Sequence, residues 1–205
     1  MPTRFLLAAL ALAIAPACGS SSTSAAGDPV GATVDQGHAS GNRIAAQASG
    51  ELAADDYMTV IGKTASILSA LDQGEVNVSS FAVQIIKDQD VFQFANDMIA
   101  QHDDANTQLD AVVRIYGVGY IPADTEATLA AEASQDLATL RGSPPRDFDF
   151  RYTEIEVQAH AEAQVLLDEL ASIVGPGEMG DYIANTRTMV DNHLNRATAL
   201  LAGFF

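Results

Sequence analysis

Three of the four histidines fall where the sequence predicts the buried face of a helix. His102 lies in a run whose apolar residues, such as Phe94 and Met98, are spaced three and four apart. His160 and His193 occupy equivalent positions in two later segments. A buried imidazole needs hydrogen-bond partners or a metal ion, because burying a polar group alone costs free energy. This spacing therefore predicts a polar or metal-binding layer inside the core.

A carboxylate completes the set. Glu75 lies on the predicted buried face of an earlier segment. Glu75 and His102 are each about 13 residues from the turn that joins their helices, and His160 and His193 agree in height to within about one helical turn. We therefore expect all four side chains to meet halfway along a bundle.

Three imidazoles and one carboxylate are a suitable ligand set for a single zinc, copper or iron ion. Glu156, one turn before His160, would be a further ligand or an acceptor that orients the imidazole. The alternative is a hydrogen-bonded layer of the same side chains that fixes the packing and binds no metal. Neither alternative specifies a reaction, and no catalytic residue is predicted.

The elements that carry these residues are all predicted to be helices. Apolar periodicity indicates helices over about 55–87, 91–116, 125–140, 148–174 and 181–202, and glycines and prolines interrupt the pattern between several of them. Asp88 or Asp90 is expected to cap the second of these helices. We predict an all-α, up-down four-helix bundle with a short extra helix in the middle crossover.

The first 17 residues have the pattern of a bacterial secretion signal. Arg4 precedes an apolar run of about a dozen residues, and the small residues Ala15 and Ala17 precede Cys18. A cysteine at this position resembles the lipidation site of bacterial lipoproteins; the alternative is ordinary secretion with an incidental cysteine. We predict export to the periplasm or outer membrane, with a membrane anchor through a lipid on Cys18.

Residues 18–52 are rich in serine, alanine and glycine and contain few large apolar side chains. Such a composition favours a flexible tether, because little apolar surface is available to offset the entropy of ordering. The helical domain is then expected to span residues 53–205. The net charge of −17 disfavours binding to nucleic acid, whose phosphates it repels.

Several stretches resemble a family of exported bacterial domains of unknown function. The matching motifs are LDQGE with Glu75, FANDMIAQHDDA with His102, FDFRYTEIEVQAH with His160, and MVDNHLNRA with His193. Members are often labelled predicted outer-membrane proteins and placed among ferritin-like bundles. Over residues 64–201, the resemblance implies a ferritin-like four-helix fold and an envelope location, but no activity.

The chain departs from ferritin-like di-iron proteins, which use Glu-x-x-His pairs. Glu156 and His160 are four residues apart, one too many for that motif. A mononuclear metal site, or none, is therefore favoured over oxygen-activating di-iron chemistry or iron storage. We interpret the sequence as an exported envelope bundle that binds one transition-metal ion. The alternative is a structural or protein-interaction module without metal.

Overall fold

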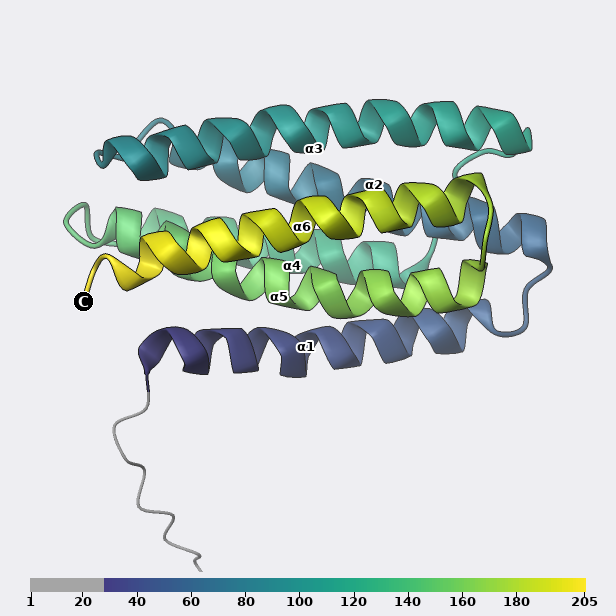
Figure 1. Cartoon of the computed structure of the whole chain (residues 1–205), viewed down its shortest axis with the longest axis horizontal. Coiled ribbons are helices and arrows are strands. Elements are labelled where there is room, and N and C mark those ends of the chain that lie inside the picture. Colours follow the sequence, from purple (N-terminus) through teal and green to yellow (C-terminus); the bar gives the residue numbers. More distant parts are fainter. Residues whose placement is uncertain (1–27) are drawn as a thin grey trace, which may run out of the picture.

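The computed structural model describes residues 28–205, which form six helices and no strand. The helices run along the long axis of the molecule (Figure 1). They are α1 (Pro29–Leu52), α2 (Tyr57–Ala82), α3 (Gln89–Tyr116), α4 (Asp124–Gly142), α5 (Phe148–Val174) and α6 (Glu178–Ala202). This arrangement confirms the all-α prediction. The predicted signal peptide and Cys18 lie outside the described residues.

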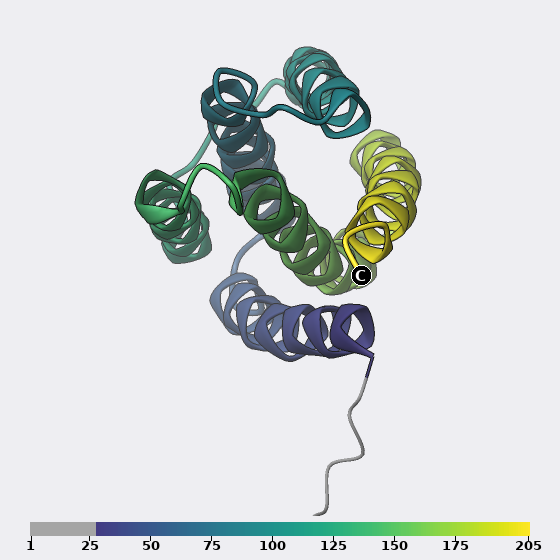
Figure 2. The same ribbon diagram turned by 90° about the vertical axis from the view of Figure 1, so that its left-hand side faces the viewer.

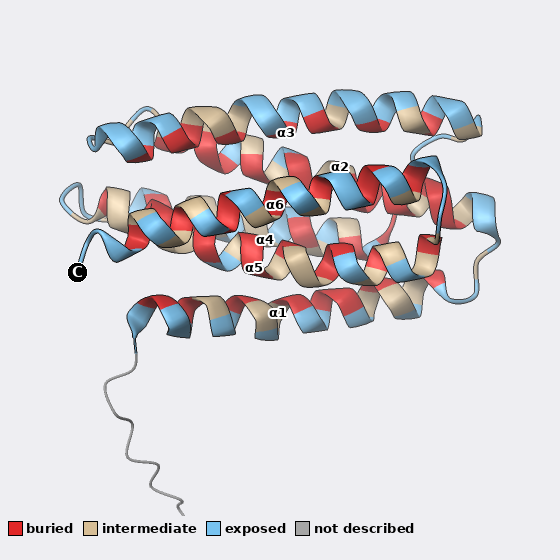
Figure 3. Cartoon of the chain, in the orientation of Figure 1, coloured by how far each residue is buried: buried red, intermediate tan, exposed pale blue. Residues whose placement is uncertain are grey.

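Four of the helices follow one another around the interior when the molecule is viewed from its end (Figure 2). α2 packs against α3, α3 against α6, α6 against α5, and α5 against α2. α1 packs chiefly on α5, and α4 chiefly on α2. The buried residues form stripes along the helices (Figure 3), as amphipathic helices around a shared core require. None of the described helices is long and apolar enough to cross a membrane.

The prediction of a flexible tether over residues 18–52 is wrong for residues 29–52, which form α1. Val30, Ile44 and Leu52 lie on the buried face of this helix. Asp28 caps its N-terminus by accepting a hydrogen bond from the backbone N–H of Val30 at 3.0 Å. The low content of large apolar residues was misleading, because α1 is stabilised by close packing of small residues.

Two glycines allow this close packing of α1 on α5. A Cβ atom at Gly37 would lie 2.6 Å from the Cβ of Ala161, and one at Gly41 would lie 2.8 Å from the Cα of Glu162. Both distances are too short for a real side-chain contact, so only glycine lets the two backbones approach so closely. The glycine content of this segment therefore reflects packing in α1.

The predicted boundaries of the remaining helices hold to within a few residues, except at the end of α2. This helix ends at Ala82, not near Lys87. The backbone N–H groups of Lys87 and Asp88 donate to the Asp149 carboxylate, with shortest distances of 3.1 and 2.7 Å. This tertiary contact fixes the connection in a non-helical path. Asp88 then caps α3 by accepting from the N–H groups of residues 90 and 91.

Candidate metal centre

The three core histidines meet inside the bundle. His102 on α3, His160 on α5 and His193 on α6 are no more than 5% exposed. One ring nitrogen of each lies within 4.8 Å of one ring nitrogen of the other two. The ring centroids are 5.2 to 6.0 Å apart. The sequence prediction that these side chains share one level of the bundle is therefore confirmed for the histidines.

His102 is oriented by a carboxylate from α2. Its Nδ1 lies 2.8 Å from Oδ1 of Asp72, and Oδ2 of the same carboxylate accepts a hydrogen bond from the Tyr182 hydroxyl at 3.1 Å. Because both carboxylate oxygens act as acceptors, Nδ1 of His102 carries a proton. Nε2 of His102 is buried and has no hydrogen-bond partner among the described residues, so its lone pair faces the interior.

His160 is oriented by its own helix. Its Nδ1 lies 2.8 Å from the backbone carbonyl oxygen of Glu156, which can only accept. Nδ1 therefore donates, and the lone pair of the neutral ring lies on Nε2. This Nε2 atom is 3.3 Å from Nδ1 of His193.

His193 is oriented by Gln101 on α3. Its Nε2 lies 3.1 Å from the Gln101 side-chain oxygen, and in this arrangement Nε2 donates. The lone pair of His193 is then on Nδ1, opposite that of His160. In a tetrahedral zinc site with Zn–N bonds of about 2.0–2.1 Å, two ligand nitrogens are about 3.3–3.4 Å apart. The separation of His160 and His193 therefore suits two ligands of one metal ion.

The electrostatics keep at least two of the imidazoles neutral. Burial, together with the neighbouring His193 and His102, holds the pKa of His160 well below its usual value. Burial is also the main cause that lowers the pKa of His193 to about 3, with His102 adding to the effect. A neutral imidazole keeps a lone pair for a metal ion, so these rings need not lose a proton to bind one.

Glu75 and Glu156 form a second group with His160. One oxygen of each carboxyl and one nitrogen of His160 lie within 4.8 Å of one another. Glu75 is not grouped with His102 and His193. The predicted four-ligand set is thus divided between two adjoining groups that share His160, with Glu156 in the second.

Neither carboxyl oxygen of Glu156 has a hydrogen-bond partner among the described residues, although the side chain is fully buried. Burial raises the pKa of Glu156 to about 8. Burial, followed by the nearby Glu156 carboxyl, raises the pKa of Glu75 well above its usual value. Two acidic groups therefore lie close together in a site that disfavours charge.

Sequence reasoning missed three residues that orient the histidines: Asp72, Gln101 and Tyr182. Asp72 lies four residues after Leu68 and three before Glu75, so its helical spacing could have identified it as buried. Gln101 directly precedes His102, and no signal in its spacing indicates contact with a different histidine. The buried Tyr152 hydroxyl lies 2.8 Å from Ser79 Oγ.

A protein-family model matches residues 43–200, a range that contains all three histidines and both carboxyls. The family is described as "Domain of unknown function (DUF4142)". The chain belongs to this family. No curated protein and no solved structure matches the chain. The DUF4142 match begins inside α1, in agreement with the finding that this helix is part of the folded unit.

Proposed function

We propose that this DUF4142 protein binds one transition-metal ion through Nε2 of His102, Nε2 of His160 and Nδ1 of His193. The observation that carries the proposal is that one ring nitrogen of each of the three histidines lies within 4.8 Å of the other two in a buried site. The second nitrogen of each ring is held by an oxygen atom: of Asp72, of the Glu156 backbone, and of Gln101. Metal-binding histidines are typically oriented in this way.

The ligand chemistry defines the class of metal. Imidazole nitrogens suit zinc, copper and iron, whereas magnesium and calcium prefer oxygen. Three protein ligands leave further coordination positions for water or another small ligand. Glu75 lies outside the three-histidine group, so the proposed site differs from the four-ligand set predicted from the sequence.

The proposal extends to location and fold. The sequence pattern around Cys18 supports export to the bacterial envelope and attachment by a lipid. The order in which α2, α3, α6 and α5 pack around the interior supports a ferritin-like four-helix core, to which α1 and α4 are added. A metal-binding protein in the envelope would act in metal handling or protection against metal stress.

Metal analysis of the untagged protein tests this function. We expect one equivalent of zinc, copper or iron after purification or after reconstitution and desalting. The melting temperature should rise with metal, because a ligand that binds only the folded state stabilises it. His102→Ala should abolish both effects. His38→Ala is the matched control, since His38 lies on α1 and contacts Gln164, away from the centre.

The alternative function is that of a structural or interaction module with a polar core layer. It is favoured by the direct contact between His160 and His193, which becomes an ordinary hydrogen bond without metal if neutral His193 carries its proton on Nδ1 and the amide nitrogen of Gln101 donates to its Nε2. Metal-free protein whose melting temperature does not change with zinc, copper or iron would support this alternative and overturn the metal proposal. Equal metal binding by the His102→Ala variant would place any bound metal elsewhere.

A further inference from the structure

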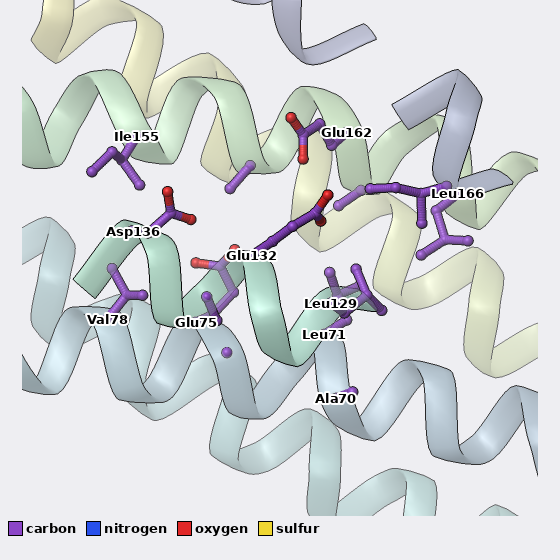
Figure 4. A pocket seen from close by; sticks show the side chains of 15 residues that line it. Ala70, Leu71, Glu75, Val78, Leu129, Glu132, Asp136, Ile155, Glu162 and Leu166 are labelled. Atoms are coloured by element: carbon purple, nitrogen blue, oxygen red, sulfur yellow. The ribbon is translucent and has the colours of Figure 1, made fainter. Parts of the chain in front are cut away.

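A pocket lined by four acids and otherwise mainly by apolar side chains, called the acidic pocket below, leads from the surface to Glu75. It lies among α1, α2, α4 and α5 and has a volume of about 50 Å³, enough for one or a few water molecules. Glu75 lines it, together with Glu132 and Asp136 on α4 and Glu162 on α5 (Figure 4). A wider polar hollow of about 140 Å³ shares the last three acids with the pocket and extends it outward.

No positive side chain forms an ion pair with these acids in the described part of the chain. Burial is the main cause that raises the pKa of Glu132 to about 7 and of Asp136 to about 6, and Glu162 adds to both shifts. The carboxyls of Glu132 and Glu162 point toward one another in Figure 4. Arg43 on α1 is near enough to offset part of the charge of Glu132 and Glu162, but four ionised acids would still leave the pocket negative and attractive to cations.

The inner end of the pocket adjoins an unsatisfied buried group. Glu75 is 7% exposed, and its carboxyl has no hydrogen-bond partner in the described part of the chain unless it shares a proton with the nearby Glu156. Glu156 is completely buried, and both of its oxygens lack a hydrogen-bond partner among residues 28–205. A buried carboxylate without a partner is costly, so the pair requires either a shared proton or a bound cation.

We propose that Glu75 and Glu156 together bind a second cation, a divalent ion of the class that prefers oxygen ligands, which enters through the acidic pocket. Two carboxylates would neutralise a charge of +2. Water in the pocket would complete the coordination, as is usual for magnesium, calcium and manganese. This inference goes beyond the three-histidine site and requires no metal there.

The geometry at His160 keeps the two sites chemically distinct. Nδ1 of His160 is 3.5 Å from Oε2 of Glu156, but it donates to the Glu156 backbone oxygen at 2.8 Å. It therefore has no lone pair for a cation at the carboxyl pair. The second site offers only oxygen, whereas the first offers only nitrogen, so the two sites should select different metals.

Terbium luminescence provides a direct test, because Tb³⁺ binds to oxygen-rich sites that accept calcium and is excited by nearby tyrosines. The chain has no tryptophan, and the buried Tyr152 lies one helical turn before Glu156. We expect saturable binding of one Tb³⁺ per chain, competed by Ca²⁺ or Mn²⁺. The double variant Glu75→Gln/Glu156→Gln should weaken this binding by more than about tenfold.

Two controls separate the outcomes. The His102→Ala/His193→Ala variant should retain Tb³⁺ binding even if it loses zinc, so failure of one site is distinguishable from failure of the other. Tyr152→Phe should reduce the sensitised emission without changing the affinity measured by equilibrium dialysis. Circular dichroism establishes that each variant is folded.

Several results would overturn the proposal. No Tb³⁺ or Mn²⁺ binding by the folded wild-type protein would mean that the carboxyls share a proton only. Weak binding of many ions, unchanged in the Glu75→Gln/Glu156→Gln variant, would mean that cations adsorb to the acidic surface. Binding lost in Glu162→Gln but kept in the double variant would place the ion in the outer pocket.

Discussion

The histidine cluster and the carboxyl pair are equally buried, yet their polar atoms are satisfied in opposite ways. Each histidine has one nitrogen held by an oxygen, from Asp72, Glu156 or Gln101. The Glu156 carboxyl has no such hydrogen-bond partner among the described residues, and another acid, Glu75, lies beside it. The difference shows that burial alone does not define a site.

The physical cause is the charge that each group carries in water. A histidine can be buried in its neutral form at little cost near pH 7, because its usual pKa is about 6.5. A carboxyl group must take up a proton or bind a cation to avoid a buried charge. We therefore expect substitutions in the two regions to have opposite effects on stability in metal-free protein.

The largest effect is expected at Asp72. In Asp72→Ala, Nδ1 of His102 loses its acceptor inside the core, and the hydroxyl of Tyr182 keeps only the backbone oxygen of Ala105 as an acceptor. We expect the free energy of unfolding to fall by about 2–3 kcal/mol, because an unsatisfied buried group costs about 1–3 kcal/mol and the Tyr182 hydroxyl also loses its bond to a charged acceptor. Urea denaturation in the presence of a chelator measures the loss.

The neighbouring Asp103→Ala variant is the control for this prediction, since Asp103 is exposed on α3. Its effect should stay within about 0.5 kcal/mol. If Asp72→Ala behaves like this control, the histidine cluster does not depend on its hydrogen-bond partners, and the contrast between the two regions fails.

The second effect has the opposite sign. Glu156→Leu removes a buried acid without a partner and keeps a side chain of similar size. We expect a gain of about 1–2 kcal/mol in the free energy of unfolding at pH 8 without metal, as when other buried charges are replaced by apolar groups. Glu154→Leu on the same helix should give no such gain, because Glu154 pairs with Arg151. A loss of stability in Glu156→Leu would indicate that the carboxyl makes a stabilising interaction.

The acidic pocket next to the carboxyl pair and the histidine cluster should also respond to pH in opposite directions. The pKa of Glu132 is raised from 4.5 to about 7, so between these pH values the folded protein keeps a proton that the unfolded chain releases. The contribution of Glu132 to stability therefore falls as pH rises from 4.5 to 7. The pKa of His193 is lowered from 6.5 to about 3, so between these pH values the unfolded chain binds a proton that the folded protein does not. The contribution of His193 to stability therefore increases as pH rises from 3 to 6.5.

Thermal unfolding against pH, with a chelator present, checks both slopes. Glu132→Gln should melt higher than the wild type at pH 8 and show a smaller difference at pH 4. His193→Gln should lose less stability than the wild type between pH 6.5 and pH 3. Parallel curves for all three proteins would contradict the electrostatic contrast between the regions.

The smallest change in stability is expected at Gln101, whose side chain is exposed on α3. In Gln101→Ala, water can replace the acceptor at Nε2 of His193, so we expect a loss of about 0.5 kcal/mol or less. Metal affinity should nevertheless fall about 10-fold or more, because the ring is no longer held in the tautomer that exposes Nδ1. Isothermal titration with zinc measures this change, and unchanged affinity would show that Gln101 does not orient the ligand.

The sequence predicted the main helices because apolar spacing of three and four is a strong local signal. It failed for α1, where the buried face is built largely from small residues such as Ala45, Ala48 and Gly41. Their role depends on the surface of α5, which is distant in sequence. The segment is indeed poor in large apolar residues, but composition does not reveal a partner helix against which small residues can pack.

The candidate site shows the same limit at the level of single side chains. Helical periodicity placed His102, His160 and His193 on buried faces, and counting residues from the turns placed them at one level. Periodicity gives the face of a helix only to within a fraction of a turn, whereas a hydrogen bond of 2.8 Å requires a particular rotation of two helices. For that reason Asp72, not Glu75, contacts His102.

The sequence by itself determined that the chain from α2 onward is helical and that three imidazoles are buried, because both follow from the order of apolar and polar residues along each helix. The tertiary structure alone decided which oxygen orients each ring, and that Glu75 joins Glu156 in a separate group. These contacts join side chains from different helices. They depend on the relative rotation and displacement of the helices, which no local pattern encodes.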